Sequence, residues 1–275
     1  MKIVSFGDSF IFGNELQNNI DGSKAWPGLI AKELNCKYET LATPGCGNDA
    51  IAQQVYSYFS TNSNKNTLAV INWTWSMRWD FYLVKPDTWI NLGPTCVPDK
   101  IKNQIDHLEA DRLITFYKDY ISESTVWNHY KSLQAIYGVQ SFLKEKNIKS
   151  IQTYMDCDLF LTNLQKPRVE HYYAVKDATW PDINNEQEFE LLPDSIRQEV
   201  NKDYYNEKSV SYIKLLRELT LKYMSTFEGN TFLEWSYKNE FAVTPSPRNH
   251  PLEEAHLAAK ELWKKSYASA LDINL

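Results

Sequence analysis

The pattern of hydrophobic and polar positions divides the chain into short apolar runs, typical of buried strands, and longer segments in which apolar residues recur with helical spacing. The apolar runs predict five strands, at Lys2–Phe6, Lys37–Ala42, Thr67–Trp73, Asn147–Met155 and Asn230–Trp235. Helical spacing predicts helices over Trp26–Leu34, Asp49–Tyr58, Ile114–Glu145, Tyr204–Phe227 and Pro251–Ala270, and a short one around Asp99–Leu108. Because strands and helices alternate from the N-terminus, we expect an α/β fold, a three-layer sandwich in which helices cover both faces of a central parallel sheet of about five strands.

Two stretches interrupt this alternation. Asp80–Leu113 contains turn residues, and Asp156–Glu199 is polar, rich in proline and longer than an ordinary connection. A length of 275 residues is ample for one core, and no Gly/Ser-rich linker divides the chain. We therefore expect a single domain over residues 1–275, with insertions at about 80–113 and 156–199 that form a lid or a substrate wall.

Charge and residue usage exclude several classes of protein. A net charge of −6 and a pI near 5.5 argue against a nucleic-acid partner. Asp8 interrupts the apolar run at the N-terminus and no segment is long enough to span a membrane, so we expect no signal peptide, no membrane association and synthesis in the cytoplasm. The four cysteines form no Cys-x-x-Cys pair, and no two of the five histidines are four residues apart. We therefore expect free thiols, no metal and no cofactor.

Polar and small residues follow the predicted strands, where ligands bind in open parallel sheets. Gly7-Asp8-Ser9 follows the first strand, Pro44–Asn48 the second and Trp73–Arg78 the third, while His250 precedes the last helix. Ser9 and His250 can therefore meet as nucleophile and general base. The alternative is that Gly7, Asp8 and Ser9 form only a turn.

These motifs resemble those of the SGNH (GDSL-type) hydrolase family, which has a flavodoxin-like sheet. The resemblance covers the whole chain in order. It implies that Ser9 is the nucleophile and that His250, directly before Pro251, is the catalytic base, and Asp8 is expected to organise the loop. It also implies an oxyanion hole made by the backbone amides of Ser9 and Gly45, with Gly47 as the alternative to Gly45.

Two departures from the family pattern leave roles open. The family's third block usually reads Gly-x-Asn-Asp, whereas this chain has Asn72-Trp73-Thr74-Trp75-Ser76, so the third oxyanion donor is Asn72, Thr74 or Ser76. Pro247 replaces the usual Asp three residues before the His. A backbone carbonyl near Pro247 would then orient His250 in a Ser–His dyad, or a carboxylate would complete a triad. The candidate carboxylates are Asp156, Asp158 and Glu234.

Aromatic and basic residues suggest a substrate. The cluster of Trp73, Trp75, Trp79 and Tyr82 could stack on a sugar ring and Arg78 could bind a carboxylate or phosphate, although core packing is the alternative for these aromatic rings. Trp180, in the second insertion, could cover the site. Gly45–Ala50 also matches a dinucleotide-binding pattern, but it follows the second strand and no acidic residue in Thr67–Trp73 is available for a ribose.

The sequence thus favours a serine esterase that acts through an acyl-enzyme on a small-molecule or carbohydrate ester, such as an O-acetyl group. One alternative is a non-catalytic carbohydrate-binding or structural module, virus-encoded or virion-associated. The other is an acyltransferase.

Overall fold

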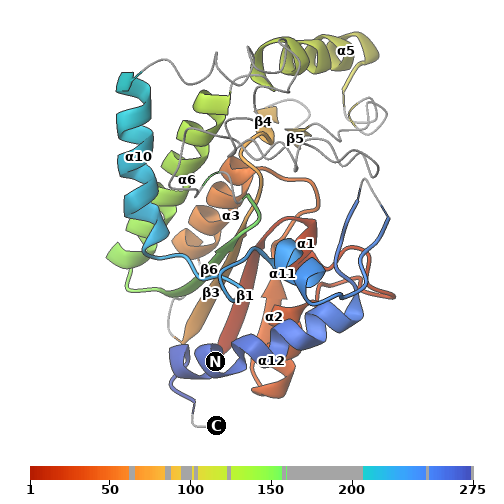
Figure 1. Cartoon of the computed structure of the whole chain (residues 1–275), viewed down its shortest axis with the longest axis vertical. Coiled ribbons are helices and arrows are strands. Elements are labelled where there is room, and N and C mark those ends of the chain that lie inside the picture. Colours follow the sequence, from red (N-terminus) through yellow and green to blue (C-terminus); the bar gives the residue numbers. More distant parts are fainter. Residues whose placement is uncertain are drawn as a thin grey trace, which may run out of the picture.

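A four-stranded parallel sheet forms the centre of the molecule. The computed structural model describes residues 1–61, 66–83, 88–93, 101, 105–122, 125–156, 159, 207–245 and 248–273. The strands are β1 (Lys2–Gly7), β2 (Lys37–Thr40), β3 (Thr67–Trp73) and β6 (Lys149–Tyr154), in the order β2-β1-β3-β6. Helices flank both faces of this sheet, so the predicted α/β architecture is confirmed (Figure 1).

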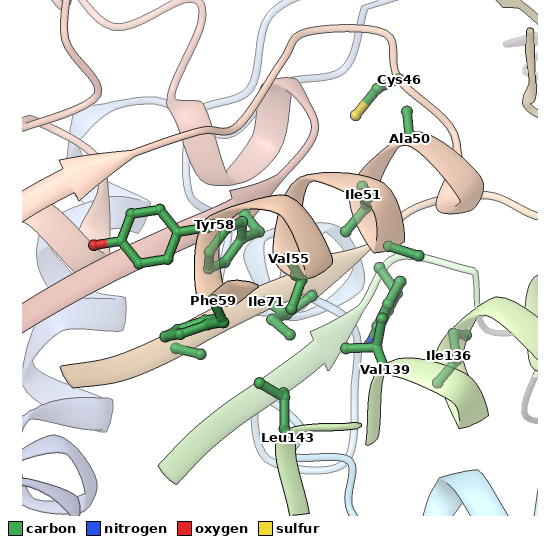
Figure 2. Close-up of a cluster of buried hydrophobic side chains, with 14 of the residues drawn as sticks. Cys46, Ala50, Ile51, Val55, Tyr58, Phe59, Ile71, Ile136, Val139 and Leu143 are labelled. Atoms are coloured by element: carbon green, nitrogen blue, oxygen red, sulfur yellow. The ribbon is translucent and has the colours of Figure 1, made fainter. Parts of the chain in front are cut away.

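One face of the sheet carries α3 (Asn48–Thr61), α6 (Thr125–Glu145) and α10 (Glu207–Leu221). The inner strands are buried on both faces, which explains their continuous apolar runs. Their side chains alternate, so that Phe6 and Ile71 point into this layer. Figure 2 shows Val55 and Phe59 of α3 close to Ile71, with Val139 of α6 on the neighbouring side.

The opposite face carries the short helix α1 (Ser9–Phe12) together with α2 (Trp26–Glu33), α11 (Phe232–Lys238) and α12 (Glu253–Ala270). Ile3, Leu68 and Val70 point into this layer. Its centre is the fully buried ring of Trp26, whose centroid lies 5.6 Å from that of Phe227 and 5.9 Å from that of Tyr267. The large aromatic content of the sequence thus fills a core between the sheet and α12.

The predicted strand at Asn230–Trp235 is wrong, because these residues begin α11. Thr231 accepts a hydrogen bond from the backbone of Glu234, whose side chain accepts one from the backbone of Thr231, which together form a capping box. Next to β6 the chain makes only a single parallel bridge, between Gln152 and Met224. The sheet therefore has four strands in the described residues rather than about five.

A hairpin of two antiparallel strands, β4 (Trp79–Leu83) and β5 (Thr88–Leu92), replaces the irregular segment expected after Asp80. It lies beyond the carboxyl ends of the sheet strands, near α5 (His107–Phe116), which is followed by the π-helix η1 (Tyr117–Ile121) (Figure 1). These elements share a small separate core that includes Ile90, Leu92 and Tyr117. The expected insertion at 156–199 falls, apart from residues 156 and 159, outside the described residues.

Candidate active site

Ser9 and His250 meet at the carboxyl end of β1. The Nε2 atom of His250 lies 2.7 Å from the hydroxyl oxygen of Ser9, although 241 positions separate the two residues. Ser9 is the first residue of α1, and His250 lies in the loop that leads to α12. The structure thus brings together the two residues that the sequence predicts as nucleophile and base.

The turn from β1 into α1 is shaped by Gly7 and Asp8. Gly7 has a φ of 146°, and a Cβ atom there would lie 2.6 Å from Ile11 and 2.7 Å from the carbonyl oxygen of Asn72, so only glycine fits. Asp8 is the N-cap of α1 and accepts a hydrogen bond from the backbone N–H of Phe10 at 3.0 Å. The backbone N–H of Ser9 has no partner within its own helix, because it belongs to the first turn.

Asp8 also ties the nucleophile to the loop after β3. Its side chain is fully buried, and its Oδ2 atom accepts hydrogen bonds from the Thr74 hydroxyl at 2.7 Å and from the Arg78 guanidinium at 2.8 Å. The buried carboxylate therefore has a cationic partner and three hydrogen-bond donors. Asp8 thus connects the β1–α1 turn to the loop after β3.

The same contacts revise two predicted roles. Arg78, expected to bind a substrate anion, instead pairs with Asp8, lies over the ring of Trp75 and donates a hydrogen bond to the Cys46 carbonyl at 3.3 Å. The hydroxyl of Thr74 donates its hydrogen bond to Asp8, and the backbone N–H of Thr74 donates to the side chain of Asn48 at 2.9 Å. Neither donor of Thr74 is therefore left for an oxyanion.

The loop after β2 leaves Gly45 open. A Cβ atom at Gly45 would have nothing within 4 Å, so glycine is required here for its φ of 89° rather than for packing. Gly47, the alternative oxyanion donor, uses its backbone N–H in a 2.8 Å hydrogen bond to Asp80. Of the two glycines, Gly45 is the one that the geometry favours.

The remaining oxyanion candidates differ in their partners. The side-chain oxygen of Asn72 accepts a hydrogen bond from Thr153 at 2.8 Å, while its buried amide nitrogen has no partner among the described residues. The backbone N–H of Ser76 donates to Asp156 at 2.8 Å. Asn72 of β3 lies opposite Gly7 of β1 in the sheet, and Gly7 precedes Ser9 by two residues. A third donor from Asn72 or from the Ser76 hydroxyl stays a prediction.

His250 is partly buried and surrounded by four charged groups. Burial lowers its pKa below the usual 6.5, and Arg78 and Arg248 lower it further, while Asp8 and Glu15 act in the opposite direction. The imidazole is therefore neutral at pH 7, and its Nε2 can accept a proton from Ser9.

None of the described carboxylates completes a triad. The Nδ1 atom of His250 has no hydrogen-bond partner among the described residues. Glu234 caps its own helix, and Asp156 binds the backbone of Ser76 and Leu159. Neither of them bonds to Nδ1 of His250 in this structure, and a role of either as the third member stays a prediction. Asp158 and Pro247 lie outside the described residues.

The tryptophans that were expected to stack on a sugar make contacts within the protein instead. Trp73 is fully buried and donates a hydrogen bond to Gln152 at 3.0 Å, so it belongs to the core and the prediction of a substrate contact is wrong. Trp75 is half-buried, with Arg78 over its ring and Phe10 packed against it. Trp180 lies outside the described residues.

His256, six residues after His250, accepts a hydrogen bond from the backbone N–H of Trp26 at 3.1 Å. It is fully buried, which lowers its pKa to about 3. This histidine holds α12 against α2 and takes no part in the site.

Solved structures that are similar to the chain cover most of its length. One is a putative lipolytic protein of the G-D-S-L family from Desulfitobacterium hafniense DCB-2. The match covers 96% of this chain and 98% of that protein, at 11% identity and a TM-score of 0.42. The chain is similar over 98% of its length to 99% of TesA, at 9% identity and a TM-score of 0.46. An acetyl xylan esterase (Est2A) from Butyrivibrio proteoclasticus matches 98% of the chain with 64% of its own, at 12% identity and a TM-score of 0.41.

No protein-family model and no curated protein matches the chain by sequence. Because the identities are this low and the TM-scores lie below 0.5, the activity is inferred from the site itself. In the described residues, no group of three or more His, Cys, Asp or Glu side chains could hold a metal ion. No helix of the described part is long and apolar enough to cross a membrane.

Three residues of the site were missed by sequence reasoning. Asn48 clamps Thr74 by accepting from its N–H and donating to its carbonyl, and Asp80 accepts from Gly47 and Ala50 at the start of α3. Phe10 stacks on His250. Asn48 carried a signal, since Asn is favoured at helix starts. Asp80 and Phe10 carried none, because their partners come from distant segments.

Proposed function

We propose that this protein is a serine hydrolase that cleaves a small ester, with Ser9 as nucleophile and His250 as general base. The observation that carries the proposal is the 2.7 Å contact between the Ser9 hydroxyl and Nε2 of a neutral, partly buried imidazole. An adjacent general base within hydrogen-bond reach is one way in which a serine nucleophile is activated, and His250 is in that position.

The reaction follows from this geometry. The Ser9 oxygen forms a bond to the ester carbonyl carbon as its proton passes to Nε2 of His250. The backbone N–H groups of Ser9 and Gly45 stabilise the negative charge on the carbonyl oxygen. The C–O bond to the alcohol then breaks, and the alcohol leaves with the proton from His250. Water attacks the acyl-enzyme by the same steps, which releases the acid and restores Ser9.

The substrate class is proposed more narrowly as an O-acetyl ester on a carbohydrate. The support for this class is the resemblance of the motifs to the hydrolase family, whereas the packing of Trp73 and Trp75 removes both rings as a sugar platform. The sugar preference therefore depends on residues outside the described part of the chain, and activity on acetylated sugars against p-nitrophenyl acetate measures it.

A fluorophosphonate probe tests the nucleophile. We expect the wild-type protein to be labelled, Ser9→Ala to lose labelling completely and His250→Ala to lose it by at least about 100-fold in rate. Ser60→Ala, which removes an exposed hydroxyl bonded only within α3, serves as the matched control and keeps the wild-type rate. An unlabelled wild type, or labelling that survives Ser9→Ala, contradicts the proposal.

A further inference from the structure

The imidazole of His250 stacks on the ring of the residue that follows the nucleophile. The ring centroids of Phe10 and His250 are 4.6 Å apart and the planes differ by 29°. Phe10 is almost completely buried, so its ring presents a fixed surface. Two consecutive residues of α1 thus contact the base, Ser9 through a hydrogen bond to Nε2 and Phe10 through the face of the ring.

Phe10 is itself supported by a second aromatic ring, that of Trp75. Trp75 packs against it at 5.2 Å with an interplanar angle of 66°, and the guanidinium of Arg78 lies 4.8 Å from the centre of the Trp75 ring. Arg78 bonds to Asp8, and Asp8 accepts from the backbone of Phe10, so the contacts close into a loop. Movement of Phe10 would break several of these contacts at once.

The other contacts of His250 fix its backbone rather than its ring. Its N–H donates to the Thr244 hydroxyl at 2.8 Å, and its carbonyl accepts from the Thr244 N–H at 2.9 Å. Neither contact restrains rotation of the imidazole about its side-chain bonds. A base whose ring turns loses the alignment with the serine hydroxyl on which proton transfer depends.

We propose that Phe10 is a positioning residue that sets the plane of the His250 imidazole by stacking, with Trp75 as its support. The inference rests on the proposed function for its catalytic consequence, but not for the ring contact itself. It assigns to an aromatic stack, in part or in full, the orienting task that a carboxylate performs in a Ser-His-Asp triad.

The surroundings of the ring allow a second readout. Asp8, Glu15, Arg78 and Arg248 are the charged groups that act on His250, and burial is the largest influence on its titration. Removal of the Phe10 ring admits water to one face of the imidazole. The imidazole then titrates at a higher pH, closer to the usual value of 6.5.

Phe10→Leu tests the proposal against Phe12→Leu, which removes a ring of the same size from the same helix. Phe12 is only partly buried and packs against the edge of the core between the sheet and helices α2, α11 and α12. For Phe10→Leu we expect kcat and the labelling rate to fall about 10–100-fold with KM little changed, and the acid limb of the pH profile to move upward. Phe12→Leu keeps the wild-type rate and limb.

A second pair of variants guards against a folding defect in Phe10→Leu. Trp75 is half-buried, so Trp75→Leu and Trp75→Phe place less strain on the fold. Trp75→Leu removes the support of Phe10 and is expected to lower kcat several-fold, whereas Trp75→Phe keeps a ring in place and restores most of it. Equal rates for the Leu and Phe variants contradict the role of the stack.

Titration of the His250 ring protons by NMR separates this inference from the proposed function. If the wild type does not react with fluorophosphonate, the proposed function fails, yet the titration still reports whether Phe10 covers the ring. A titration midpoint that rises in Phe10→Leu and not in Phe12→Leu supports the stack. An unchanged midpoint together with an unchanged rate in Phe10→Leu overturns it.

Discussion

The nucleophile and the base of this site are held in different ways. Ser9 follows a buried carboxylate that joins the β1–α1 turn to the loop after β3, because Asp8 accepts hydrogen bonds from Phe10, Thr74 and Arg78. The backbone of His250 is held by the hydroxyl and the backbone N–H of Thr244, and its ring contacts the Ser9 hydroxyl and stacks on Phe10. The loop of the nucleophile is thus fixed by charge and hydrogen bonds, whereas the plane of the base's ring depends on packing. We therefore expect that different substitutions disturb the nucleophile and the base.

The largest effect is expected from Asp8→Ala. The change leaves Arg78 without its anion and removes the cap of α1, so the free energy of unfolding falls by about 3–5 kcal/mol. Urea denaturation measures this loss. Asp8→Asn is the comparison, because its side-chain oxygen still accepts from Phe10 while the charge is gone, and it should lie between Asp8→Ala and the wild type. If Asp8→Ala proves as stable as wild type, Asp8 does not anchor the nucleophile end.

Outside the site, in the core between α2 and α12, His256 makes stability depend on pH. Its pKa is about 3 in the folded protein and near 6.5 when unfolded, so between these values the unfolded chain binds more protons and stability falls as the pH is lowered. The expected slope is about 1.4 kcal/mol per pH unit. His256→Asn keeps an acceptor for Trp26 but cannot titrate, and its unfolding free energy from pH 6.5 to 4 should decline less steeply. Identical slopes would show that another group dominates.

A smaller effect is expected where α3 meets β4. A Cβ atom at Gly47 would lie 2.7 Å from Asp80 and 2.8 Å from the carbonyl oxygen of Arg78, so Gly47→Ala forces the hairpin away from the oxyanion loop. We expect a loss of about 1–3 kcal/mol in thermal or urea unfolding. Gly93→Ala is the matched control, since its Cβ would meet only the Arg78 side chain at 3.5 Å. An equal loss of unfolding free energy in the two variants would show that the close contact of Gly47 with Asp80 does not hold α3 and β4 together.

The smallest effect concerns two charges near the surface. Arg248 lowers the pKa of His250 and Glu15 raises it, and the two side chains form an ion pair at 3.1 Å. Arg248→Gln should therefore shift the acid limb of the kcat profile to higher pH, and Glu15→Gln should shift it to lower pH. In the wild type this limb lies below pH 6.5, because burial lowers the pKa of His250. Shifts in the same direction would mean that these charges do not act through His250.

Much of the fold could be predicted because strand and helix patterns are local. The buried strands β1 and β3 read as apolar runs, and their carboxyl ends mark the site by topology alone, so Ser9 could be named before any coordinates. The false strand at Asn230–Trp235 was avoidable, since Thr231 and Glu234 have the spacing of a capping box. In this segment the helix-start signal decides the structure, although the residues also form an apolar run.

The roles of polar side chains could not be predicted, because they depend on partners far along the chain. In the sequence Thr74 has the properties of an oxyanion donor. In the structure its hydroxyl donates to Asp8, 66 positions away, and its backbone N–H donates to Asn48, 26 positions away. Arg78 looks like a substrate anchor until its partner proves to be the same Asp8. Sequence spacing identifies which residue types can do chemistry, but not which of them are already engaged.

The two edges of the four-stranded sheet, as far as the structure describes the chain, also bear on how the protein avoids self-association. An open sheet edge is a template for pairing with other chains. Here the edge at β6 is met by a single turn of backbone, where Ser225 donates to the Gln152 carbonyl at 2.7 Å, and the edge at β2 is only four residues long and carries Lys37 and Glu39. Interrupted, short and charged edges are poor templates, so the sheet resists edge-to-edge aggregation even though it is not closed into a barrel.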